Sequence, residues 1–165
     1  LVEQSIYKKL SYMPESYNQQ QHQALELFKQ RIFLEKTIDE AISFNKSIAF
    51  ENTNPNLGLA TTAENLIDVF KLRSDVYTNI NYQDEFPDTI EGLNFDKYDN
   101  NSAILFYKNN NIVTGTTRLI FDSDNKLPSE SKSTFDSFRN HYENIGEVSR
   151  LMIKHNSIQL KHGLK

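Results

Sequence analysis

The spacing of apolar positions predicts helices in the first half of the chain. Over residues 21–44 apolar side chains recur at intervals close to those of a helix, with charged residues between them. Turn-forming residues at 52–58 interrupt this pattern. A second helix is predicted from the capping pattern Thr61-Thr62-Ala63-Glu64 to about Thr78. We expect the first helix to be a packing element or a lid beside the main sheet.

The second half of the chain contains apolar runs and alternating patterns that predict β-strands. An apolar run at 103–107, the turn residues 109–111 and a return run at 112–121 predict a hairpin whose second strand is central, because both of its faces are largely apolar or β-branched. A short helix is predicted over 134–142 and a third strand over 147–153. Strict alternation in that strand places Glu147, Ser149, Leu151 and Ile153 on the face opposite to Val148, Arg150 and Met152.

Composition narrows the class of protein. The 165 residues suit one domain, and the mixture of helices and strands indicates the α/β (α+β) fold class. A net charge of −4 gives no reason to expect nucleic acid, and no apolar run approaches the roughly 20 residues of a membrane-spanning helix, so no stable membrane insertion is expected. The absence of cysteine excludes disulfides and thiolate chemistry and favours a cytoplasmic location. The four histidines show no metal-binding spacing, so no metal is expected.

Four charged side chains interrupt the apolar patterns. Arg73 falls within the apolar stripe of the second helix, Arg118 lies on the covered return strand, and Glu147 and Arg150 lie on the third strand. For Arg73 two alternatives stay open, because a guanidinium that faces a core needs a carboxylate or a cleft, whereas one at the edge of the stripe reaches water. Glu147 and Arg150 are either functional groups or an ordinary ion-pairing set near a strand end.

The loop over residues 79–101 is rich in acids and long for a compact domain. Asp96 and Asp99 are candidate partners for Arg73. We expect the loop to pack down on the domain through its four aromatic residues, Tyr82, Phe86, Phe95 and Tyr98.

Four short motifs that contain these charges stand in the order of a known family. They are Arg73-Ser-Asp-Val-Tyr77, Asp96-Lys-Tyr-Asp99, Gly115-Thr-Thr-Arg118-Leu119 and Glu147-Val-Ser-Arg150-Leu151. Together they resemble the autoinducer synthase / N-acyl amino acid synthase branch of the GNAT acyltransferase superfamily, over about half of the chain. Leu127-Pro-Ser-Glu130 resembles the Leu-Pro segment that lies between the strands carrying the family's Gly-x-x-Arg-Leu and Glu-x-x-Arg motifs.

The resemblance is stronger to N-acyl amino acid synthases than to acyl-homoserine-lactone synthases. Phe86-Pro-Asp-Thr-Ile-Glu91 and Leu127-Pro128 are similar to the former group. The chain carries Asn94 where homoserine-lactone synthases usually have an acid, and it has no tryptophan.

The resemblance implies a GNAT-like acyltransferase fold over residues 51–165, with a mixed, mostly antiparallel central sheet flanked by helices, and an N-terminal helical extension over residues 1–50. Such folds continue after the strand at 147–153 with a helix, further strands and a loop for the donor's phosphates, whereas only residues 154–165 follow here. We therefore expect the second half of the domain to be incomplete, and one hypothesis places missing residues around Asn156. Gln159–Gly163 departs from the phosphate-loop pattern and reads more like a helix end capped by Gly163.

The implied function is transfer of a fatty acyl group from an acyl thioester to the amine of an amino acid or similar small acceptor. The donor is acyl carrier protein or acyl-CoA, with acyl carrier protein the expected partner and no permanently bound cofactor. One alternative is acyl-homoserine-lactone synthesis, and a second is a degenerate, non-catalytic GNAT-fold binding module.

The resemblance also implies roles for seven residues. Glu147, Arg150 and Arg118 are the expected catalytic residues, with Glu147 as the base that takes the amine proton and nearby backbone N–H groups around Ser149 holding the oxyanion. Arg118 and Arg150 are expected either to pair with Asp96, Asp99 and Glu147 or to bind an acceptor carboxylate. The expected substrate-binding residues are Arg73, Asp96, Asp99 and Ser149.

Overall fold

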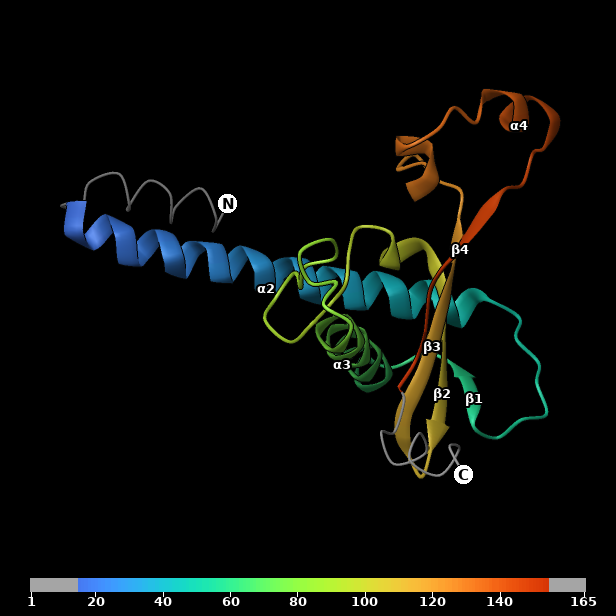
Figure 1. Cartoon of the computed structure of the whole chain (residues 1–165), viewed down its shortest axis with the longest axis horizontal. Coiled ribbons are helices and arrows are strands. Elements are labelled where there is room, and N and C mark those ends of the chain that lie inside the picture. The colour runs from blue at the N-terminus through green and yellow to red at the C-terminus, as the bar shows by residue number, and fades with distance from the viewer. Residues whose placement is uncertain (1–14, 155–165) are drawn as a thin grey trace, which may run out of the picture. The chain divides into compact units, whose positions relative to one another are not determined.

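The computed structural model describes residues 15–154, which form helices and one antiparallel sheet (Figure 1). The predictions for residues 155–165, which concern Asn156, the loop-like segment Gln159–Gly163 and the end of a helix, lie outside the described residues. The elements in chain order are α2 (Glu15–Ser47), β1 (Leu57–Leu59), α3 (Ala63–Asn79), the 3-10 turn η1 (Asp99–Asn101), β2 (Ser102–Asn109), β3 (Ile112–Phe121), the 3-10 turn η2 (Pro128–Ser131), α4 (Asp136–His141) and β4 (Gly146–Ile153).

The chain divides into two compact units between Lys36 and Thr37, and the second unit contains the sheet. The predicted boundary at residue 50, between an N-terminal helical extension and the acyltransferase domain, stays a prediction. None of the helices within residues 15–154 is long and apolar enough to cross a membrane.

The four-stranded sheet has the order β1-β2-β3-β4, with every neighbouring pair antiparallel. The α+β class, the hairpin and the central position of β3 are therefore confirmed. Asn110 and Asn111 make the hairpin turn with positive φ angles of 51° and 64°, a conformation that asparagine tolerates better than most residues. Strand β1 (Leu57–Leu59) was not predicted, because its first two residues fall within the segment 52–58 that was read as turn and because three residues are too few to show a period.

Helix α3 packs against the sheet through contacts with β3 and β4. Its N-cap is Thr62, whose side chain accepts the Asn65 N–H at 3.2 Å, so the capping sequence was right but the cap lies one residue later than Thr61. Leu66, Val69 and Phe70 on its apolar face are fully buried. Arg73, on the same face, is also 0% exposed, so the alternative that places it at the wet edge of the stripe is wrong.

The end of α2 from residue 37 onward is tied to the sheet by one buried amide. The Asn45 side chain donates to the Ser102 carbonyl at 3.0 Å and accepts the Ile104 N–H at 2.9 Å, which satisfies two backbone groups of β2. Because these groups are buried, the amide replaces the partners that water would otherwise supply. This part of α2 is a packing element, as expected.

The acidic loop after α3 packs down as predicted, although one aromatic residue does not take part. Phe86 stacks on Tyr77 with ring centroids 4.9 Å apart, and Phe95 stacks on Phe70 at 5.2 Å. Tyr82 is 50% exposed. The stacking fixes the loop beside α3 and brings two of its aspartates, Asp96 and Asp99, to Arg118 on the sheet.

A bulge in β4 overturns the predicted alternation of that strand. Thr116 pairs with Met152 but Arg118 pairs with Ser149, so two residues of β4 face Thr117 of β3 alone. Arg150 takes up the extra residue with a φ of +56°. Met152 is therefore buried on the face shared with Ser149, while Leu151 is 75% exposed. The bulge turns Arg150 to the side on which Glu147 and Ser149 lie, where strict alternation would have separated them.

Candidate active site

A pocket of about 460 Å³ lies over β3 and β4, beside the acidic loop and η2. Five of the seven predicted site residues line it: Asp96, Arg118, Glu147, Ser149 and Arg150. Its other walls come from aromatic side chains and from the segment around η2, namely Tyr77, Phe86, Tyr98, Pro128, Ser129, Ser131 and Lys132. Arg73 and Asp99 are fully buried and do not line the pocket.

Asp96 is held in the pocket wall by two arginines. Arg118 donates to both of its carboxylate oxygens, at 2.7 and 2.9 Å, and Arg150 donates to Oδ2 at 3.1 Å. Arg118 also donates from Nε to the Ser149 hydroxyl at 2.9 Å. This two-pronged geometry leaves Arg118 with no free edge for a substrate carboxylate.

Asp99 supports the same cluster from behind. Its Oδ1 accepts from Arg73 at 2.8 Å and from Arg118 at 3.0 Å, and its Oδ2 accepts the Asp96 N–H at 2.8 Å. One carboxylate thus links α3 to β3 and closes the turn that carries Asp96. Of the predicted partners for Arg73, Asp99 is the one that it contacts.

Arg150 lies against two aromatic rings, which stack on each other, at the other side of Asp96. Its guanidinium carbon is 4.7 Å from the centre of the Phe86 ring and 5.3 Å from that of Tyr77, and it donates to the Tyr77 hydroxyl at 2.6 Å. Stacking on flat rings suits the planar guanidinium. Its Nε is buried and has no hydrogen-bond partner among the described residues.

The charges within the cluster support one another. Burial alone would raise the pKa of Asp96, but the hydrogen bonds and charge of Arg118 lower it to about 2. Burial likewise opposes the charge of Arg118, yet the nearby Asp99 and Asp96 carboxylates raise the pKa of that guanidinium. For Arg73 burial has the larger effect and lowers its pKa, with the positive charge of Arg118 acting in the same direction. Asp96 and Arg118 are therefore ionised and paired with each other at neutral pH.

Glu147 stands apart from this pairing. Its Oε2 accepts the Ser129 N–H at 2.9 Å, and none of the described residues forms an ion pair with it. The expected pairing of Arg118 and Arg150 thus holds for Asp96, with Arg118 also reaching Asp99, but not for Glu147. A carboxylate that faces a pocket without a cation beside it is able to accept a proton from a bound molecule.

Several pocket residues had no predicted role. Ser129 and Lys132 belong to the segment that begins with the Leu-Pro motif, so the motif pointed to the region without showing which groups face the pocket. Phe86 was noted only as a packing residue. Its position under Arg150 follows from the fold of the loop, and no spacing in the sequence indicates it.

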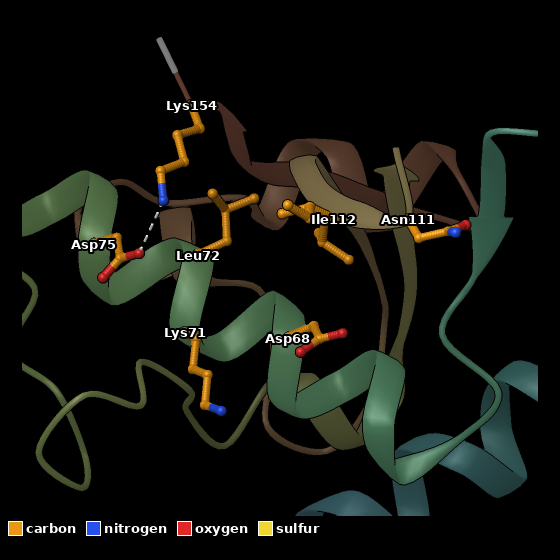
Figure 2. A pocket seen from close by; sticks show the side chains of 8 residues that line it. Asp68, Lys71, Leu72, Asp75, Asn111, Ile112 and Lys154 are labelled. Atoms are coloured by element: carbon orange, nitrogen blue, oxygen red, sulfur yellow. Dashed lines mark hydrogen bonds and ion pairs between the residues drawn. The ribbon is translucent and has the colours of Figure 1, made fainter. Parts of the chain in front are cut away.

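A second hollow, of about 230 Å³, lies between α3 and the start of β3 (Figure 2). At its rim Lys154 reaches across to Asp75 at 3.4 Å, while Lys71 extends away from that pair. Unlike the pocket at Glu147, it gathers none of the predicted site residues. Within residues 15–154 no group of three or more histidine, aspartate or glutamate side chains is placed to hold a metal ion.

Comparison with known proteins decides the family. The family described as "N-acyl amino acid synthase FeeM" matches residues 68–162, which is more than half of the chain and includes every residue of the cluster. The chain belongs to this family. The resemblance found in the four motifs is thereby confirmed, on the N-acyl amino acid synthase side that Phe86–Glu91 and Leu127-Pro128 favoured.

One solved structure also aligns with this FeeM-family chain. It is titled "Crystal Structure of the AHL Synthase LasI" and aligns with a TM-score of 0.42 at 21% identity. The alignment covers 61% of this chain and 53% of that one, so the chain spans about half the length of the solved protein. A search of curated protein sequences gave no match.

Proposed function

We propose that the chain is an N-acyltransferase that moves a fatty acyl group from an acyl thioester to the amine of an amino acid. The observation that carries this proposal is the unpaired carboxylate of Glu147 in a pocket whose two arginines are already paired with Asp96. Membership of the N-acyl amino acid synthase family supports the same chemistry.

In the proposed reaction Glu147 takes a proton from the acceptor amine, directly or through one water. The amine nitrogen then forms a bond to the thioester carbonyl carbon, and the carbon–sulfur bond breaks. The thiolate that leaves recovers the proton from Glu147, so the protein is unchanged at the end. Backbone N–H groups at the β4 bulge near Ser149 and Arg150 are proposed to stabilise the oxygen that gains charge, because a bulge frees groups from the sheet ladder.

The acceptor is proposed to carry a carboxylate, and Lys132 is proposed to bind it. Arg118 and Arg150 are engaged with Asp96, so binding a carboxylate through them would disrupt the cluster. Lys132 lines the same pocket, and its ammonium forms no ion pair with the rest of the described chain. An exposed lysine with a free ammonium matches the charge of an amino acid's carboxylate.

The donor is proposed to be acyl carrier protein, which makes that protein the expected partner, and a cytoplasmic location accords with it. Its pantetheine arm lacks the nucleotide half of coenzyme A and so depends less on a phosphate loop. A mostly apolar groove of about 200 Å³, lined by residues of all four strands, lies elsewhere on the sheet, and it shares no lining residue with the pocket at Glu147. This groove is therefore not an extension of the pocket at Glu147.

The test is lipid analysis of cells that produce the protein. Wild-type protein should leave new N-acylated amino acids, detected by mass spectrometry, and Glu147→Gln should leave none while retaining the wild-type circular dichroism spectrum. Glu143→Gln, an exposed carboxylate four residues earlier, is the matched control and should behave as wild type. Undiminished product in Glu147→Gln would remove Glu147 as the base, and no product from wild-type protein would favour the non-catalytic alternative.

A further inference from the structure

One wall of the pocket belongs neither to the sheet nor to α3. It is the segment from Leu127 to Ser131, in the connection between β3 and β4, and it presents the Ser129 N–H to Glu147 at 2.9 Å. Pro128, Ser129 and Ser131 all line the pocket. The orientation of Glu147 therefore depends on whatever holds this segment in place.

The segment is closed by Glu130. The carboxylate Oε2 of Glu130 accepts the Leu127 N–H at 2.6 Å, and the Glu130 N–H donates to the Leu127 carbonyl at 3.0 Å. This reciprocal pair fixes the two ends of one turn, as a capping box fixes the start of a helix. With its side chain only 8% exposed, Glu130 faces inward rather than into solvent.

Arg139, on α4, clamps Glu130 to the end of β3. It donates to both oxygens of Glu130, from Nε and from Nη2, at 2.6 Å each. It also donates to both oxygens of Asp122, the residue after β3, at 2.8 Å each. Both forks of the guanidinium are thus filled, which is the most specific geometry that an arginine makes with carboxylates.

The clamp also neutralises a repulsion. Hydrogen bonds from Arg139 lower the pKa of Glu130 to about 2 and lower the pKa of Asp122, so both carboxylates are ionised at neutral pH. Without the guanidinium, the negative charges of Glu130 and Asp122 would face each other with no cation between them. Their repulsion would push the turn at 127–131 away from the end of β3.

We propose that Arg139, which lines no part of the pocket, is a positioning residue for acyl transfer: through Glu130 and the turn at 127–131 it fixes the Ser129 N–H that orients Glu147. This inference rests on the proposed function. A purely stabilising ion-pair network is the competing explanation. The two explanations differ in what Arg139→Gln does to turnover.

The positioning role predicts a loss in kcat rather than in binding. A general base contributes through its exact placement, and a displacement of the order of 1 Å costs up to about 100-fold in rate. We expect Arg139→Gln to lower kcat by roughly 10- to 100-fold while KM for the acceptor changes by less than about threefold. Arg139→Lys should recover part of kcat, because an ammonium restores the charge but cannot fork onto both carboxylates.

The experiment combines kinetics with a spectroscopic reporter that needs no substrate. Rates are measured with myristoyl-acyl carrier protein as the donor probe and the amino acid recovered in the lipid product as the acceptor. The ¹⁵N–¹H spectrum follows the Ser129 amide, whose proton should move upfield in Glu147→Gln and also in Arg139→Gln. Arg31→Gln, which removes an exposed pair with Glu35 on α2, is the matched control and should change neither measurement.

The outcomes separate this inference from the proposed function. An active wild-type protein whose Arg139→Gln variant keeps both kcat and the Ser129 amide position overturns the inference alone. Wild-type protein that makes no product overturns the proposed function and the inference with it. If Arg139→Gln fails to fold, Asp122→Asn loosens one side of the clamp and should lower kcat in the same direction; unchanged kcat there also overturns the inference.

Discussion

The buried ion pair between Arg73 and Asp99 provides the most direct test of how this site is built. Both side chains are 0% exposed, and Asp99 also faces Arg118 at 3.0 Å. The change Asp99→Asn keeps the shape of the side chain but removes its charge. Arg73, whose Nε and Nη2 already lack partners among the described residues, then has no counter-ion, and Arg118 keeps only Asp96.

The expected loss follows from burial. Removing one partner of a fully buried pair costs about 3–5 kcal/mol, because the remaining charge stays desolvated. For a chain of this size each kcal/mol lowers Tm by roughly 2–4 °C, so Asp99→Asn should lower Tm by about 6–20 °C. The assay is urea unfolding followed by circular dichroism, together with calorimetry.

The matched control is Glu35→Gln, which removes an exposed pair with Arg31 and should cost less than about 1 kcal/mol. The double variant Arg73→Met with Asp99→Leu removes both charges and should regain at least half of the loss, since buried pairs are often replaced by apolar residues at little cost. A loss below about 1 kcal/mol in Asp99→Asn would refute the reasoning, because the pair would then be no stronger than a surface one.

Three further predictions concern separate parts of the molecule. Lys132→Met should raise KM for the amino acid acceptor by roughly tenfold with little change in kcat, in steady-state assays, because it removes binding that is equal in ground and transition states. The folded pKa of Asp96, about 2, lies below its ordinary 3.8, so the stability that this carboxylate contributes is complete above about pH 4 and is lost as the pH falls toward 2; urea unfolding from pH 2 to 7 should show Asp96→Asn converging with wild type at the acid end. A Cβ at Gly58 would meet the Phe106 ring at 2.8 Å, so Gly58→Ala should destabilise by about 1–3 kcal/mol in the same unfolding assay, and an unchanged midpoint would show that the ring moves aside.

Much of the fold was predictable because its periods are long or its turns are chemically distinct. Helix α3 shows an apolar stripe bounded by a capping threonine, and the β2–β3 hairpin turns on Asn110 and Asn111. Strand β1 was missed for the opposite reason, since the three residues Leu57–Leu59 are too few to display a periodic pattern. The predicted faces of β4 failed because one bulge at Arg150 reverses every side chain after it, and only the pairing with β3 determines where a bulge lies.

The site was partly predictable by a different route. Arg73 and Arg118 stood out as charges at positions where an apolar residue was expected, and each needs a carboxylate if it is buried. Asp96 and Asp99 were among the predicted partners, and in the structure Asp99 pairs with Arg73 and Asp96 pairs with Arg118. Contacts of Lys132, Ser129 and Arg139 had no such signal. They come from a connection without period, where the position of each side chain is set by tertiary hydrogen bonds.

The paired charged groups and the unpaired charged groups of the pocket suit different roles in catalysis. Both Arg118 and Arg150 donate to Asp96, so a ligand that bound to this carboxylate or to the donating N–H groups would have to replace hydrogen bonds already made at 2.7–3.1 Å. Such a cluster can hold a wall rigid and set the field within the pocket, which is the form of preorganisation that catalysis requires. Proton transfer and binding of a charged acceptor instead need groups that are not yet paired, and Glu147 and Lys132 meet that condition. It follows that substitutions in the cluster should act on stability and turnover together, whereas Glu147→Gln should act on turnover and Lys132→Met on binding.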